Sequence, residues 1–181
     1  SVFSKAGYRT EAIAPDTYFA SNISWLYKGF DNIDKSAVLG PCGKHKNGRK
    51  VTDAALKRLD ELAGLKKFFL WVHYTDAHPP HKLPKGIEPI FGTEERDIYD
   101  RELLLLDDAL KYLFKGIEKR LGNKKYIIAV AADHGHAFDP KHEKSHQDHD
   151  VSTAVTHIPL MFFSPYGKGI RSDQLAQSID V

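Results

Sequence analysis

Short apolar runs alternate with longer amphipathic segments along the 181-residue chain. Three runs of strand length are apolar at nearly every position: Lys67–Tyr74, Tyr126–Ala132 and Ile158–Ser164. Strands without polar alternation are typical of sheets that are covered on both faces. A further short strand is predicted at Tyr8–Ala14, after the tail of a helix that ends near Ala6–Gly7.

Two amphipathic helices are predicted between these strands. The first has Thr52 as its N-cap and Gly64 beyond its end, with apolar residues at helical spacing between them: Ala55, Leu59 and Leu62. The longer helix, Asp97–Leu121, ends at Gly122 and has one apolar face, although Gly116 inside it is a poor helix former. Buried strands that alternate with helices indicate an α/β fold, with a mostly parallel sheet sandwiched between helices.

Composition narrows the classes of protein that fit this pattern. The chain is 41% hydrophobic and 28% charged, as in ordinary globular domains, so extensive disorder is not expected. No apolar run reaches the ~18 residues of a membrane-spanning helix. The formal net charge of +2 is too small to indicate nucleic acid as the main partner. Cys42 is the sequence's one cysteine, which excludes an internal disulfide and a cysteine-based zinc site.

Histidines gather in two stretches of the chain. Eight of the ten lie within His73–His81 or His134–His149, and each stretch follows a predicted strand. Imidazole is the commonest metal ligand and a frequent acid–base group, so this clustering indicates a chemical site.

The ends of the predicted strands bring the candidate residues together. The first apolar run leads into Asp76 and His78, and the second leads into Asp133 and His134. Ligands of open α/β sheets bind beyond the carboxyl ends of the strands. If the strands are parallel, one cleft is predicted to hold all four side chains.

Asp133 and His134 are the candidate metal ligands, because a carboxylate and an imidazole suit divalent ions. Gly135 allows the backbone to turn tightly after them. The alternative is a strand end that closes in an Asx turn with solvated histidines.

Residues of the first cluster have competing interpretations. Two prolines follow His78 and stiffen its loop, so its imidazole could contact an anionic oxygen or protonate a leaving group; the alternative is a surface histidine. His73 lies inside the apolar run and is interpreted as a hydrogen-bonded core residue. Asp76 either orients a neighbouring histidine or caps its own turn. Cys42 has no paired base nearby in the sequence and is interpreted as incidental.

The polar stretch after His136 contains three more histidines: His142, His146 and His149. Loops of this length are often functional, so these residues are either ligands or part of a solvated loop, and the sequence favours neither.

Seven segments resemble, in order, those of the sulfatase family within the alkaline-phosphatase superfamily. AGYRTEAIAP, GFDNID and FFLWVHYTDAHPPH come first, followed by YDRELLLLDDAL, VAADHGHAF, THIPLMFFSP and QSIDV. Each segment alone is a weak signal, whereas the ordered set is specific. The resemblance covers most of the chain and implies an alkaline-phosphatase-like fold.

The resemblance also implies roles for individual residues. Asp133 and His134 match the second pair of metal ligands, and His78 matches the histidine that contacts the sulfuryl or phosphoryl group. His146 lies where family members carry a histidine or lysine that binds the substrate anion. The implied reaction is hydrolysis of a sulfate ester, with a divalent metal, calcium above all, that polarises the ester oxygens.

Some expected motifs of the family are missing from 1–181. The nucleophile motif, a cysteine or serine in C/S-x-P/A-x-R, is absent, and no amino-terminal acidic pair fits. Both precede the GYRT strand in the family. The chain is therefore expected to be a single, partial sulfatase-like catalytic domain, an internal fragment with little activity of its own.

Other functions stay open beside the sulfatase. Residues Ala14–Thr17 stand where many sulfatases have a Lys-Trp-His turn. The alternative is therefore a phosphodiesterase, or a phosphoethanolamine or phosphoglycerol transferase, of the same superfamily. Such a phosphotransferase would use zinc or manganese. A non-catalytic metal- or anion-binding module is a third reading. The expected partner is a sulfated or phosphorylated substrate, with no nucleic acid and no membrane segment. The resemblance slightly favours an extracytoplasmic location.

Overall fold

The computed structural model describes residues 1–21, 28–138 and 152–177. The chain divides into two compact units, Ser1–Gly122 and Asn123–Val181, and each is described by itself. That 1–181 forms a single catalytic domain stays a prediction.

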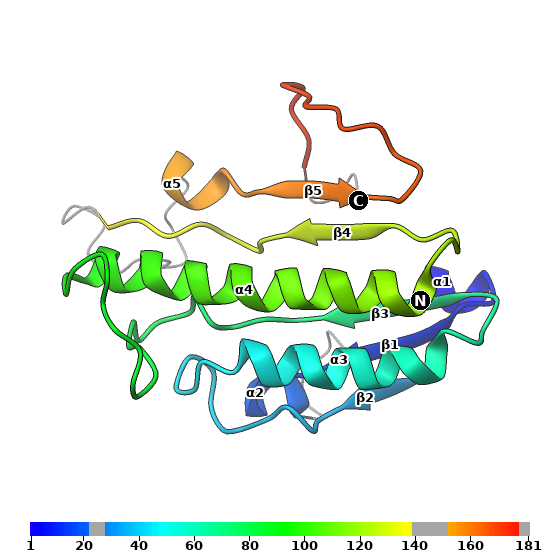
Figure 1. The fold of residues 1–181 in the computed structure, drawn as a ribbon, viewed down its shortest axis with the longest axis horizontal. Coiled ribbons are helices and arrows are strands. Elements are labelled where there is room, and N and C mark those ends of the chain that lie inside the picture. The colour runs from blue at the N-terminus through cyan, green and yellow to red at the C-terminus, as the bar shows by residue number, and fades with distance from the viewer. Residues whose placement is uncertain (22–27, 139–151, 178–181) are drawn as a thin grey trace. The chain divides into compact units, whose positions relative to one another are not determined.

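The first unit is built on a parallel sheet of three strands: β1 (Arg9–Ile13), β2 (Asn32–Asp34) and β3 (Phe68–Val72). Their order is β2-β1-β3, and Glu11 of β1 aligns with a residue on each side of it, Asn32 and Leu70. The predicted α/β fold with a parallel sheet is confirmed (Figure 1). The strand predicted at Tyr8–Ala14 is the central strand of this sheet.

Two long helices cover one face of this sheet, α3 (Gly48–Leu62) and α4 (Glu95–Leu121) (Figure 1). The buried residues of this layer come from β1, from both helices and from the segment after β2: Ile13, Ala37, Val51, Ala54, Ala55, Leu56 and Leu113. Burying one large aliphatic side chain contributes ~1.5–3 kcal/mol, so this layer holds the first unit together.

The opposite face of the sheet is covered by smaller elements, including α1 (Val2–Lys5) and α2 (Thr17–Ala20). Ala12 and Ala14 are buried there, and partly buried side chains pack against them: Phe19, Ala20, Phe30, Ile33 and Val38. The ring of Phe3 in α1 stacks on Phe69 at a centroid distance of 4.3 Å. The sheet therefore lies between helices, as the sequence predicted.

The start of α3 differs from the prediction. Thr52 is an interior residue of this helix, is fully buried, and has its hydroxyl oxygen 2.8 Å from the Tyr74 hydroxyl. The N-cap is Asn47, and the N–H of Gly48 donates to Oδ1 of Asp76 at 2.8 Å. A contact between positions 28 residues apart fixes this helix start, so local capping signals in the sequence do not reveal it.

Helix α4 agrees with the prediction to within two residues. A capping box formed by Glu94 and Asp97 begins it, and Gly122 ends it with φ 53°. Gly116 is buried where α4 meets α3, since a Cβ there would lie 2.4 Å from a methyl carbon of Leu56. This residue, a poor helix former, is explained by the close approach of the two helices.

The second unit contains β4 (Ile128–Ala131), α5 (Thr153–Thr156) and β5 (Leu160–Phe163). Strands β4 and β5 pair antiparallel, with Ile128 opposite Phe163. Both strands lie within their predicted segments. However, the expectation that β5 is buried is wrong, since Met161, Phe162 and Phe163 are exposed.

The predicted pairing of the central strands also needs correction. Within the described residues, β3 pairs only with β1, and β4 pairs only with β5. Within its own unit β3 is an edge strand, and β4 has an antiparallel partner, so neither is shown as a central strand of a parallel sheet. That the two strands belong to one sheet concerns both units and stays a prediction. An antiparallel pair needs no helical crossover between its strands, and α5 is a single short turn of helix.

Membrane spanning is a separate question. Among the described residues, no helix combines the length and the apolar character needed to cross a bilayer.

Gly116→Ala is expected to destabilise the protein by about 1–2 kcal/mol. The gain in helix propensity, about 1 kcal/mol, is smaller than the cost of overpacking Leu56 in a filled core. Gly64→Ala is the matched control, because nothing lies within 4 Å of its added Cβ. Urea denaturation of both variants tests this, and equal midpoints would contradict the packing explanation.

Candidate functional site

The segment that follows β3 carries the first cluster of candidate residues. Asp76 is buried, and its Oδ1 accepts the N–H of Gly48 at the start of α3. Burial raises the pKa of this carboxyl, and the neighbouring Lys46 ammonium opposes that rise. Asp76 therefore caps a helix distant in sequence, whereas the sequence suggested a cap of its own turn or a contact with a histidine.

Two further side chains of this segment have packing roles. Tyr74 is largely buried, and this burial raises the pKa of its hydroxyl to about 12. The ring of His73 is half-buried, with its centroid 4.2 Å from that of Phe19. His73 thus packs against the face of the sheet that α2 covers, which agrees with its interpretation as a structural residue.

His78 is held firmly at both its ring and its backbone. Its Nδ1 lies 2.6 Å from the carbonyl oxygen of Pro79. A carbonyl only accepts hydrogen bonds, so Nδ1 is the donor, and any acid–base chemistry of this ring would have to use the other nitrogen, Nε2. The carbonyl of His78 accepts from Nζ of Lys46 at 2.6 Å, and its N–H donates to the Thr75 carbonyl at 3.1 Å.

Gly43 packs directly against this turn. It has φ +69°, and a Cβ at this position would lie 1.9 Å from the Pro79 carbonyl oxygen and 2.9 Å from Nδ1 of His78. Only glycine fits this approach without displacing the turn. The segment that contains Cys42 and Gly43 therefore packs against the His78 turn. The sequence drew attention only to Cys42 in this segment and indicated no role for it.

A buried charged group lies beside the same turn and was not predicted. The carboxylate of Glu102, in α4, accepts from the His81 ring at 2.8 Å, from the Lys82 N–H at 2.9 Å, and lies 3.2 Å from Nζ of Lys46. The Lys46, His81 and Glu102 side chains are 4%, 1% and 0% exposed. Glu102 stands next to a run of leucines in the sequence, which gives no sign of this role.

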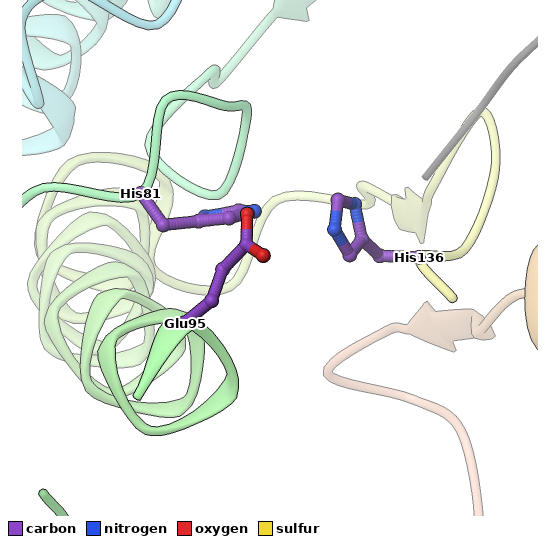
Figure 2. A group of neighbouring side chains, drawn as sticks. All are labelled: His81, Glu95 and His136. Atoms are coloured by element: carbon purple, nitrogen blue, oxygen red, sulfur yellow. The ribbon is translucent and has the colours of Figure 1, made fainter. Parts of the chain in front are cut away.

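His81 docks on one face of α4. Three residues spaced as successive helical turns contact or approach its ring: Glu95, Tyr99 and Glu102. Burial raises the pKa of the Tyr99 hydroxyl. A ring nitrogen of His81 lies within 4.8 Å of a Glu95 carboxylate oxygen, and the two side chains are directed toward each other (Figure 2). The hydrogen bond that orients the His81 ring is therefore the one to Glu102, and Glu95 adds a second carboxylate nearby.

The second unit holds the predicted metal ligands at the end of β4. Nδ1 of His134 lies 2.8 Å from the Gly135 carbonyl oxygen, and its Nε2 lies 3.8 Å from Oδ2 of Asp133. The His134 N–H donates to Oδ1 of Asp133 at 3.0 Å. Because Nδ1–H donates to this carbonyl, a neutral His134 ring has its lone pair on Nε2, the nitrogen that lies 3.8 Å from Oδ2 of Asp133.

This arrangement fits a divalent cation. One ion with ligand distances of ~2.0–2.5 Å can contact an oxygen and a nitrogen 3.8 Å apart. The sequence explained Gly135 by a tight turn, but the structure gives a steric explanation. A Cβ at this position would lie 2.1 Å from the Ala154 carbonyl oxygen. Its N–H also donates to the Val155 carbonyl at 2.6 Å, which fixes the backbone that follows Asp133 and His134 against α5.

Some predicted residues lie outside the described part of the chain. His146, the predicted anion-binding histidine, is among them, as are His142 and His149. Asp76 and His78 belong to the first unit, and Asp133 and His134 belong to the second. Their meeting in one cleft stays a prediction, as do the assigned roles of His78, Asp133 and His134.

Comparison with known proteins decides the family. The sulfatase family model matches residues 1–181. The chain belongs to the sulfatase family. This confirms the resemblance seen in the ordered sequence segments, and the family generally uses a divalent metal.

A solved structure shows the same fold. It is a protein in the alkaline phosphatase superfamily from Vibrio parahaemolyticus, with 21% sequence identity and a TM-score of 0.64. The match covers 90% of this sulfatase-family chain and 40% of that protein, so the chain spans well under half of its structural relative. A comparison with curated protein sequences gives no match.

Gly43→Ala is expected to destabilise the sulfatase-family chain more than Gly7→Ala. Both glycines have positive φ, +69° and +78°, so each alanine adds backbone strain of about 1–2 kcal/mol. Only at Gly43 does the Cβ also meet the Pro79 carbonyl. Chemical denaturation measures the difference, and equal losses would show that the turn yields without cost.

Asp76→Asn tests the buried carboxyl through pH. The raised pKa means that folded Asp76 holds its proton more tightly than the unfolded chain does, so folding weakens as pH rises above 3.8 through the folded pKa. Asparagine retains a capping oxygen without the charge. The stability of Asp76→Asn relative to the unmodified protein should therefore increase from pH 4 to pH 7. A difference in urea midpoint that does not change with pH would contradict this.

Proposed function

We propose that the chain forms part of a metal-dependent sulfatase that hydrolyses sulfate esters. The observation that carries the proposal is the family match over residues 1–181. Two features of the structure support it: a histidine held rigidly in the turn after β3, and an adjacent carboxylate and imidazole oriented to share a cation after β4.

His78 would contact the sulfuryl oxygens through Nε2. Since Nδ1 donates to the Pro79 carbonyl, Nε2 must also carry a proton to donate to an anionic oxygen. The anion-binding form of His78 is therefore the imidazolium, whose positive charge complements the sulfate. The same proton could be delivered to the leaving-group oxygen as the ester bond breaks.

Asp133 and His134 would hold the divalent cation, which supplies positive charge next to the ester oxygens when it is bound. Asp133 provides a hard oxygen ligand, and His134 provides Nε2 with its orientation fixed by Gly135. Calcium is the ion that the family resemblance favours, whereas an imidazole ligand also suits zinc. Which of these metals the protein binds is therefore decided by the titration described below.

One observation favours a phosphodiesterase or phosphotransferase as the second candidate. Asp16 stands in the segment that replaces the Lys-Trp-His turn of many sulfatases. It is buried, and its Oδ1 caps α2 by accepting the N–H groups of Tyr18 and Phe19. This segment therefore lacks the cationic side chains of that turn, and this departure from the sulfatase pattern keeps relatives that act on phosphoryl groups as the second candidate.

Metal affinity and turnover in the full-length protein test this assignment. Calorimetric titration with Ca²⁺, Mn²⁺ and Zn²⁺ should show at least about tenfold weaker binding in Asp133→Ala, which lacks a direct ligand. His78→Ala should retain metal affinity while turnover of an aryl sulfate falls by about 100-fold or more. Asp173→Ala and His157→Ala are the exposed controls in the second unit.

Three outcomes would change the assignment. Unchanged metal affinity in Asp133→Ala would remove this residue from the metal site. Equal losses of metal affinity in Asp133→Ala and His78→Ala would show that the division of roles is wrong. Faster turnover of a phosphodiester than of an aryl sulfate would favour the second candidate function.

A further inference from the structure

The turn that carries His78 has few backbone groups by which it can be held. Pro79 and Pro80 have no N–H, so two consecutive residues of the turn offer no backbone donor. The His78 N–H donates within the segment, to the Thr75 carbonyl, and three other groups tie the turn to more distant parts of the chain: the His78 carbonyl, the His81 ring and the Lys82 N–H. Each of these three groups is bound by a charged side chain from elsewhere in the first unit.

Lys46 and Glu102 supply all of these contacts. Nζ of Lys46 donates to the His78 carbonyl at 2.6 Å and lies 3.2 Å from Oε1 of Glu102. The same Oε1 accepts the Lys82 N–H, and Oε2 faces Nδ1 of His81. One ion pair thus holds the turn at its beginning and at its end.

Burying the Lys46–Glu102 ion pair costs free energy, and the contacts that the pair makes with the turn explain why a charged pair stands here. Both side chains are almost completely withdrawn from solvent, and a buried ion pair is often no more stabilising than an apolar pair of similar volume. Apolar side chains could fill the space but could not bind a carbonyl, an N–H and an imidazole at once. The charged pair therefore serves the geometry of the turn.

We propose that Glu102 and Lys46 are positioning residues for His78. The His78 ring takes its direction from the Pro79 carbonyl, which lies inside the bracketed turn, so movement of the turn moves Nε2. Misplacement by about 1 Å of a group that contacts substrate can reduce the rate ~100-fold. The inference rests on the proposed anion-binding role of His78. It adds that Glu102 and Lys46, which do not contact the substrate themselves, position this histidine.

Isosteric variants of the full-length protein provide the test. Glu102→Gln keeps the shape of the side chain and removes its charge, and Lys46→Met does the same for the lysine. Each is expected to lower kcat for an aryl sulfate by about 10–100-fold, with KM changed by less than about threefold. Glu118→Gln on the exposed side of α4 and Lys44→Met in the same loop as Lys46 are the controls and should retain kcat.

A spectroscopic measurement separates positioning from general loss of stability. In protein labelled at histidine ¹³Cε1, the His78 signal, assigned with His78→Gln, should shift or split in Glu102→Gln while the His157 signal stays in place. An unchanged His78 signal together with unchanged kcat in a folded Glu102→Gln variant would overturn the proposal. If Glu102→Gln does not fold, the paired Glu102→Gln/Lys46→Met variant removes both members of the ion pair together, and normal kcat in that variant would overturn the proposal equally.

The same labelled protein distinguishes failure of this inference from failure of the proposed function. Titration with inorganic sulfate or phosphate should move the His78 signal of the unmodified protein if His78 binds the anion. No response to either anion, together with a displaced His78 signal in Glu102→Gln, would remove the anion-binding role but uphold the positioning pair. A response to anion that is identical in Glu102→Gln would uphold the role of His78 and overturn the positioning pair.

Discussion

One buried hydrogen bond, from the Gly48 N–H to the Asp76 carboxylate, determines how the candidate site is assembled. It joins the segment after β3 to the first residue of α3 across 28 positions of sequence. The approach is so close that a Cβ on Gly48 would lie 3.0 Å from both carboxylate oxygens. Because α3 begins here, the residues just before it, including Gly43 and Lys46, lie against the His78 turn and can hold it.

Burying the carboxyl groups of Asp76 and Glu102 lowers the stability of the folded protein, and the nearby Lys46 ammonium reduces this loss. Burial raises the pKa of Asp76, and Glu102 raises it further, whereas Lys46 lowers it. The Lys46 ammonium lies 3.2 Å from Oε1 of Glu102 and lowers the pKa of Asp76, so it compensates both acidic side chains electrostatically. A change at Lys46 is therefore expected to affect the α3 cap and the His78 turn together, since one ammonium group serves both contacts.

The sequence predicted those features that depend on local pattern and left out those that depend on distant contacts. Periodicity and a terminal glycine located α4 to within two residues, and apolar runs located β3, β4 and β5. The start of α3 was missed because Asp76 fixes it from another segment. Glu102 was missed because nothing near a leucine run distinguishes a buried glutamate from an exposed one. The sequence marked Asp76 as a candidate residue but did not identify Gly48 as its hydrogen-bond partner, because the sequence pattern does not show which distant groups come into contact.

His78 and His134 share a local geometry that explains how one fold prepares two different kinds of histidine. Each donates Nδ1–H to the carbonyl of the residue that follows it, Pro79 or Gly135, at 2.6 and 2.8 Å. In each ring, Nε2 is therefore the nitrogen through which the proposed chemistry would occur. A metal needs that nitrogen without a proton, whereas a sulfate oxygen needs it with one. The backbone contact sets only which nitrogen is available. Under the proposed function, a cation beside the Asp133 carboxylate would require the unprotonated form of His134, and a bound anion would favour the protonated form of His78.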